Sequence, residues 1–305
     1  MIVPALMPLS GLVLAGGEPV AGVILVMAFV FGACVGSFLN VCIARWPFEL
    51  SVVSPRSRCP RCLRPIRPAE NIPLVSWLLL RARCRGCGLP ISAVYPAMEL
   101  VTALGWMSAV AAFGPTFTAG RVAVFGTVLL GIAVTDARHY LIPDGFTVFG
   151  FLFVLATSVF GAMLGESVPF AAPYQALLGA CAGAGAIAIA GWLGEVALRK
   201  EAMGLGDVTL MAMVGAALGP GRSLVTIFVA ALIAVVVFLG VVYPLGRLRR
   251  GRTREQGELA LGDPPMELPD VPFGVFLAPA ALLVLLWGQT LAAWYLSYME
   301  RAGSS

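Results

Sequence analysis

Four carboxylates lie within or at the ends of long apolar segments, where an ionisable side chain is costly and by default a functional candidate. They are Glu99, Asp136, Glu195 and Asp207. Asp136 ends one apolar segment and Asp207 opens a later one. Two carboxylates held together at one membrane depth share a proton, as an aspartic peptidase requires, because like charges so close cannot both ionise. One would activate a water while the other donates to the scissile carbonyl, so Asp136 and Asp207 are candidate catalytic residues.

The same carboxylates have simpler interpretations. A carboxylate at a helix end can be an interfacial cap, and the Gly-x-Gly-Asp segment that contains Asp207 is short. Glu99 and Glu195 are alternatively structural partners of loop arginines, and Asp144 is an N-terminal helix residue after Pro143. From placement alone, the catalytic pair and the interfacial caps both remain open.

Two CxxC pairs, Cys59–Cys62 and Cys84–Cys87, occur between the first two apolar segments. Each pair can form a tight knuckle with both thiolates on one ion, and this spacing is typical of a structural zinc ribbon. Two disulfides or a redox pair are the alternatives, which a reducing compartment disfavours. We therefore predict a zinc site at Cys59, Cys62, Cys84 and Cys87, where the metal would stabilise a loop with few large apolar side chains.

The composition places these residues in a membrane. The chain has 305 residues, of which 59% are hydrophobic and 12% charged, against roughly 25% charged in an average soluble domain. The first apolar segment lacks the charged n-region of a cleavable signal peptide, so we expect it to remain in the mature protein. We predict an all-α polytopic membrane protein with eight transmembrane helices and a cytoplasmic tetracysteine loop that resembles a zinc ribbon. The predicted spans are 20–43, 93–113, 119–136, 144–164, 173–197, 205–219, 222–244 and 272–297.

Basic residues predict the orientation of these spans. The loops 44–92, 137–143, 198–204 and 245–271 fall on one side and hold 17 of the 20 Lys and Arg residues. The positive-inside rule assigns that side to the cytoplasm and places both termini outside. We attribute the net charge of +4 to topology and contact with membrane lipid, and we expect no nucleic-acid partner.

The motifs resemble those of the type IV prepilin peptidases, a GxGD aspartic peptidase family of bifunctional leader peptidases and N-methyltransferases. Two segments near the N-terminus, Gly36–Val41 and Asn71–Trp77, resemble family signatures. So do the segment from Asp136 to Asp144, the segment Gly204–Val208, and Pro272–Gly274 before the last helix. The chain departs from the family at Ala82 and Val275, where Gly and Pro are usual, and at Thr209, where Lys is common.

The resemblance implies an activity, a location and a cofactor. Such enzymes sit in the bacterial inner membrane and cleave the basic leader of prepilins or pseudopilins after a Gly at the cytoplasmic face. They then methylate the new N-terminal residue with S-adenosylmethionine. We expect residues 1–92 to hold the first helix and the methyltransferase-associated tetracysteine region, and residues 93–305 to form a seven-helix peptidase domain. The sequence identifies no residue that contacts S-adenosylmethionine.

Two other functions fit the composition without the resemblance. A transporter or channel would use its carboxylates to relay protons near mid-membrane on broken helices. A non-catalytic assembly scaffold would use the cysteine loop to recruit partners and would tolerate Asn at either Asp.

Overall fold

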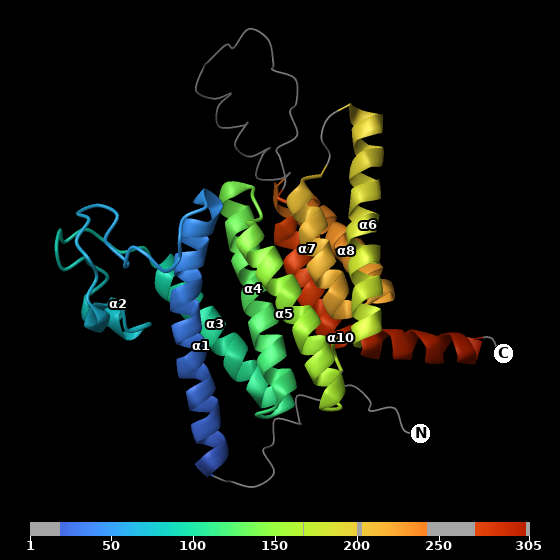
Figure 1. The fold of residues 1–305 in the computed structure, drawn as a ribbon, viewed down its shortest axis with the longest axis horizontal. Helices are drawn as coiled ribbons and strands as arrows, with labels where there is room; N and C mark the ends of the chain where they lie inside the picture. Colours follow the sequence, from blue (N-terminus) through green and yellow to red (C-terminus); the bar gives the residue numbers. More distant parts are fainter. Residues whose placement is uncertain (1–18, 167, 200–202, 243–271, 303–305) are drawn as a thin grey trace.

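Within the part of the chain that the structure describes, eight long helices form the bundle drawn in Figure 1. The computed structural model describes residues 19–166, 168–199, 203–242 and 272–302. The long helices are α1 (Pro19–Arg45), α3 (Val94–Phe113), α4 (Phe117–His139), α5 (Asp144–Met163), α6 (Pro173–Leu198), α7 (Leu205–Leu218), α8 (Pro220–Val237) and α10 (Gly274–Ala302). A π-helical turn, η4 (Phe238–Val242), extends α8. The loop after α1 holds η2 (Trp46–Phe48), η3 (Pro68–Glu70) and the short α2 (Val75–Leu79).

These helices confirm the predicted all-α membrane architecture. By length and composition, six helices in the described part of the chain can cross a membrane. The other two apolar helices are shorter, namely α7 and the first part of α10, Gly274–Gly288. The C-terminal part of α10 runs crosswise to the bundle in Figure 1. The arginine-rich loop predicted at 245–271 and part of the loop 198–204 lie outside the described residues.

Glycines allow two helix pairs to approach closely. On α1, a Cβ at Gly36 would lie 2.8 Å from the Cα of Glu99 on α3. On α6, a Cβ at Gly179 would meet the carbonyl oxygen of Gly215 on α7, and one at Gly183 would meet the carbonyl of Met211. Small residues spaced by four are a common way for membrane helices to pack without large side chains between them. The interface with α6 therefore fixes the position of α7.

The helix α7 forms the centre of the bundle, with α5, α6, α8 and α10 around it. Its residues from Leu210 to Leu218 are almost entirely buried. Gly219 ends the helix at a φ of +83°, a conformation that side chains disfavour, and Pro220 begins α8 directly afterwards. The predicted Gly-Pro-Gly turn therefore does separate two helices.

A buried arginine and a partly buried one close the end of the bundle opposite Asp136. Arg121 is 1% exposed and packs over the Phe170 ring, 4.0 Å from its centroid. Its Nη1 donates to the Glu166 carbonyl at 3.1 Å. Arg222 donates to the carbonyl of Pro169 at 2.7 Å. Both arginines thus hold the connection between α5 and α6 against the helix ends.

Candidate active site and metal centre

Asp136 lies in the last turn of α4 and is 5% exposed. Its Oδ2 accepts a hydrogen bond of 3.1 Å from the backbone N–H of Val275, in the first turn of α10. A Cβ at Gly274 would lie 2.8 Å from the same oxygen. The Pro272–Gly274 motif therefore brings the positive N-terminal end of α10 onto the Asp136 carboxylate.

Asp207 lies in the first turn of α7 and is half-buried. Its backbone N–H donates to the Gly204 carbonyl at 3.1 Å, which starts the helix. Asp207 lies within electrostatic range of Asp136. The C-terminal end of α4 and the N-terminal end of α7 are both at the top of the bundle in Figure 1.

Ile142 connects the two halves of this site. A Cβ at Gly206 would lie 3.0 Å from the Ile142 Cβ, and one at Gly274 would lie 3.0 Å from the Ile142 Cδ1. The glycine beside Asp207 and the glycine beside Asp136 therefore touch one side chain. The structure thus brings both sequence-predicted carboxylates to one place, within reach of two helix N-termini that stabilise negative charge.

The remaining candidate residues take structural positions. The Glu99 carboxylate accepts a hydrogen bond of 2.7 Å from the backbone N–H of Leu74, so it ties the loop to α3 without an arginine. Glu195 is exposed near the end of α6. Asp144 is the first residue of α5 after Pro143, as predicted. None of the three contacts Asp136 through a hydrogen bond that the described residues form.

The four loop cysteines converge on one point. Their sulfur atoms all lie within 4.8 Å of one another, and all four are free thiols. Each pair forms the same knuckle: the N–H of Cys59 donates to the Arg64 carbonyl, and the N–H of Cys84 donates to the Leu89 carbonyl. Backbone N–H groups of Cys87 and Gly86 lower the pKa of the Cys84 thiol to about 6. This donor set can hold a metal ion, because thiolates are the form that binds one.

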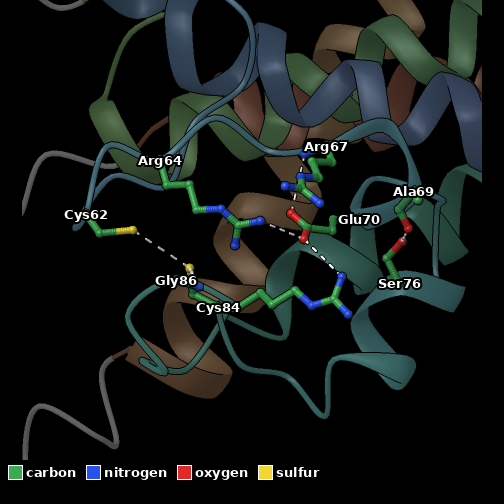
Figure 2. Close-up of polar contacts among 9 residues, drawn as sticks. Cys62, Arg64, Arg67, Ala69, Glu70, Ser76, Cys84 and Gly86 are labelled. Carbon is green, nitrogen blue, oxygen red and sulfur yellow. Dashed lines mark hydrogen bonds and ion pairs between the residues drawn. The ribbon is translucent and has the colours of Figure 1, made fainter.

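Glu70 joins the two knuckles and was not anticipated from the sequence. Its carboxylate pairs with Arg64 of the first knuckle at 2.9 Å (Figure 2). It also pairs with Arg85 of the second knuckle at 3.4 Å. Burial raises the pKa of the Glu70 carboxyl, but the backbone N–H of Arg67 and the Arg64 guanidinium outweigh burial and hold the pKa below its ordinary value. Only its spacing from the cysteines could have suggested this role.

Comparisons with known proteins place the chain in a family. Residues 30–113 match the bacterial Peptidase A24 N-terminal domain, and residues 123–239 match the Type IV leader peptidase family. A "Prepilin leader peptidase/N-methyltransferase" of Myxococcus xanthus is 39% identical over 267 residues, which cover 85% of this chain and 78% of that protein.

Proteins of the same name from other bacteria are similarly related. The Aeromonas salmonicida protein is 34% identical over 298 residues, 89% of this chain and 93% of its own length. The Bacillus subtilis protein is 32% identical over 268 residues, 88% of this chain and 96% of its own length. No solved structure matches the chain. The motifs, the helical bundle and these relatives together show that the chain belongs to the type IV leader peptidase family.

Proposed function

We propose that this protein is an intramembrane aspartic endopeptidase that cleaves the leader of prepilins or pseudopilins and then N-methylates the new N-terminal residue. The observation that carries the peptidase assignment is the approach of Asp136 and Asp207 at one end of the bundle, beside the N-termini of α7 and α10. The names of relatives that cover most of the chain support both activities.

In the proposed reaction, the two carboxylates share one proton. The ionised member takes a proton from a water as that water attacks the scissile carbonyl, and the neutral member donates its proton to the carbonyl oxygen. Collapse of the tetrahedral intermediate returns a proton to the leaving amine. The N–H of Val275 holds the Asp136 carboxylate in place for these transfers.

A cavity that shares Ile142 with the surroundings of the carboxylate pair suits part of the substrate. It has a volume of about 570 Å³ and is lined by residues of η2 and of the connection between α4 and α5, among them Trp46, Ile142 and Pro143. Because Ile142 also borders the glycines next to Asp136 and Asp207, residues of the leader can lie in this cavity while the scissile bond reaches the carboxylates. The hydrophobic helix after the cleavage site would stay in the bilayer.

The second activity involves the N-terminal region. We assign Cys59, Cys62, Cys84 and Cys87 to a structural zinc ion, since two CxxC knuckles supply its preferred tetrahedral thiolate set. S-adenosylmethionine would supply a methyl group to the free amine. The amine would lose a proton, and the donor would be released as S-adenosylhomocysteine. The boundary near residue 92 between this region and the peptidase helices is part of the proposal.

The family, together with six described helices that are long and apolar enough to cross a membrane, makes this a multi-pass inner-membrane protein. The orientation is our inference. The excess of Lys and Arg in the loop after α1 and in the predicted loops on that side supports a cytoplasmic site with both termini outside.

Cleavage of a prepilin-like peptide in liposomes tests the catalytic pair. We expect Asp136→Asn and Asp207→Asn each to lower kcat by at least ~10³-fold, because neither variant can share and transfer the proton. Glu195→Gln, on the exposed face of α6, is the matched control and should cleave like wild type. Near wild-type cleavage by either Asn variant would rule out the pair.

Metal analysis and a methyl-transfer assay test the second activity. Cys59→Ser should lose bound zinc. A zinc content equal to that of wild type would rule out the proposed zinc site. Wild-type protein should transfer a labelled methyl group to the cleaved product. Cleavage without transfer would reduce the function to that of a peptidase.

A further inference from the structure

The cavity of about 570 Å³ between η2 and the connection from α4 to α5, hereafter the acidic cavity, has an uneven distribution of charge. Two of its lining residues, Glu49 and Asp144, are acidic, and none is basic. Both are exposed, and neither forms an ion pair with any residue that the structure describes. The acidic cavity therefore offers two unpaired carboxylates to a cationic group.

Most of the remaining lining of the acidic cavity is apolar. Trp46, Leu50 and Ile142 contribute large apolar side chains, and Pro47 and Pro143 contribute their rings. Lysine and arginine side chains combine a long apolar stem with a cationic tip, so the stem gains by lying on apolar surface while the tip stays in water or meets a carboxylate. The lining thus suits a peptide segment that contains Lys or Arg.

A neighbouring cavity has the opposite charge. It has a volume of about 400 Å³, lies between the later turns of α1 and the cysteine loop, and shares Val52 with the acidic cavity. Its lining holds Arg45 and Arg56 and no acidic residue. The Arg45 guanidinium donates to the carbonyls of Ser51 and Pro55 at 2.8 and 2.7 Å. The loop after α1 therefore separates basic from acidic groups, and a cationic segment is attracted to the acidic cavity alone.

Contacts between η2 and the start of α5 fix the walls of the acidic cavity. The rings of Trp46 and Phe146 meet edge to face, with their centroids 4.4 Å apart. A Cβ at Gly145 would lie 2.6 Å from the Trp46 ring, so a side chain there would push the two elements apart. The Glu49 N–H donates to the Trp46 carbonyl at 3.0 Å. The backbone that carries both carboxylates is thus in place before a substrate binds, which lowers the cost of binding.

The acidic cavity also adjoins the catalytic pair. Ile142 lines the cavity and borders the glycines beside Asp136 and Asp207. In the chain, Ile142 lies between Asp136 at the end of α4 and Asp144 at the start of α5. A substrate whose scissile bond lies at the catalytic pair therefore has neighbouring residues within reach of the cavity.

We propose that Glu49 and Asp144 select the basic residues of the leader, an inference that rests on the peptidase half of the proposed function. Lys or Arg side chains that precede the scissile bond pair with these two carboxylates while their stems lie on the apolar lining. Glu49 belongs to the region that we assign to methyl transfer, and Asp144 belongs to the peptidase helices. The two regions therefore share one peptidase subsite.

Cleavage kinetics of two prepilin-like peptides test this role. One peptide has a basic leader, and the other has Gln in place of each leader Lys and Arg. Phosphatidylcholine liposomes carry no net charge, so a preference for the basic peptide comes from the protein. We expect Glu49→Gln and Asp144→Asn each to raise the KM of the basic peptide by roughly threefold, as for loss of one exposed ion pair. The kcat, and the KM of the neutral peptide, should stay at wild-type values.

Charge reversal gives a complementary measurement. Glu49→Lys should prefer a third peptide, with Glu in place of the leader Lys and Arg, over the basic peptide, because the sign of one partner is inverted. Asp144→Glu keeps the charge and should cleave like wild type. Glu195→Gln is the matched control, because Glu195 is also exposed but lies outside the acidic cavity.

Three results would overturn the inference while leaving the peptidase assignment intact. They are equal KM values of wild type for the basic and neutral peptides, a KM for the basic peptide that neither substitution raises, and a rise that is the same for both peptides. The last result would show that the two residues support the fold and do not read charge. No cleavage of any peptide by wild type would instead overturn the proposed function, and this inference with it.

Discussion

The Asp136 carboxylate is held by a backbone group 139 residues further along the chain, the N–H of Val275. Such a contact is invisible to sequence patterns, since it depends on how α4 and α10 pack. Carboxylates at the ends of apolar segments could be predicted, because charge inside a membrane is costly and therefore conspicuous. The motif Pro272–Gly274 was identified by resemblance, but its contact with Asp136 required the structure.

Gly274→Ala tests that contact. The added Cβ would lie 2.8 Å from the Asp136 Oδ2, so the carboxylate has to move. A misplacement of about 1 Å at a reacting group can cost roughly 10²-fold in rate, so cleavage assays should show a lower kcat, by up to that factor, with unchanged zinc content. Gly120→Ala on α4, where nothing lies within 4 Å of the new Cβ, is the control. Equal cleavage by the two variants would contradict the geometry.

Ala82 occupies a position where the family usually has Gly, and its φ is +57°. A left-handed conformation costs an L-residue roughly 1 kcal/mol. Ala82→Gly should therefore raise the free energy of unfolding of the loop by about that amount, measured as slower zinc loss to a chelator. Ala97→Gly within α3 should instead lower the thermal stability of the protein, because Ala97 is helical and glycine destabilises a helix. Faster zinc loss from Ala82→Gly would show that the strain is absent.

At the scale of elements, α7 is placed by its contact with α6. The break between α7 and α8 could be predicted from Gly219-Pro220-Gly221, because a glycine with positive φ followed by proline ends one helix and begins the next. Which faces pack together could not be predicted. An apolar helix in lipid has no polar face to distinguish its inside, so the glycine contacts appear only in the structure.

Gly179→Leu should separate these helices. Its side chain would occupy the space of the Gly215 carbonyl, so α7 and Asp207 must shift. We expect a fall of several degrees in the midpoint of thermal unfolding in detergent, as overpacking costs roughly 1–3 kcal/mol. Gly185→Leu, on the same helix with nothing within 4 Å, should melt like wild type. A shared midpoint for both variants would mean that the close approach is absent.

The loop has its own electrostatic element in Glu70. Its carboxyl pKa is held below the ordinary value in the folded loop, so its stabilising effect is full above the unfolded pKa of roughly 4.3 and is lost as the pH falls through the lower, folded value. Glu70→Gln should therefore melt below wild type at pH 7, and the difference should shrink in acid. If the difference in melting temperature between Glu70→Gln and wild type did not change with pH, the effect would come from packing and not from charge.

Over the whole molecule, charge counting gives an orientation that fusions can test. Alkaline phosphatase joined after Gly114 or Gly165 should be active, since both lie between helices at the predicted outer side. Fusions after Val53 or Tyr140 should be inactive in the cytoplasm. The reverse pattern of activity would show that the bundle has the opposite orientation, with the carboxylate pair on the outer side.

The sealed end of the bundle decides which compartment supplies the catalytic proton. Below Asp207, α7 is almost entirely buried from Leu210 to Leu218, and Arg121 and Arg222 donate hydrogen bonds to the connection beneath it. We therefore expect the carboxylate pair to exchange protons with the compartment at its own end of the bundle. In the proposed orientation that compartment is the cytoplasm, so turnover should follow the internal pH of the cell and, unlike transport by a proton transporter, should not respond to the proton-motive force.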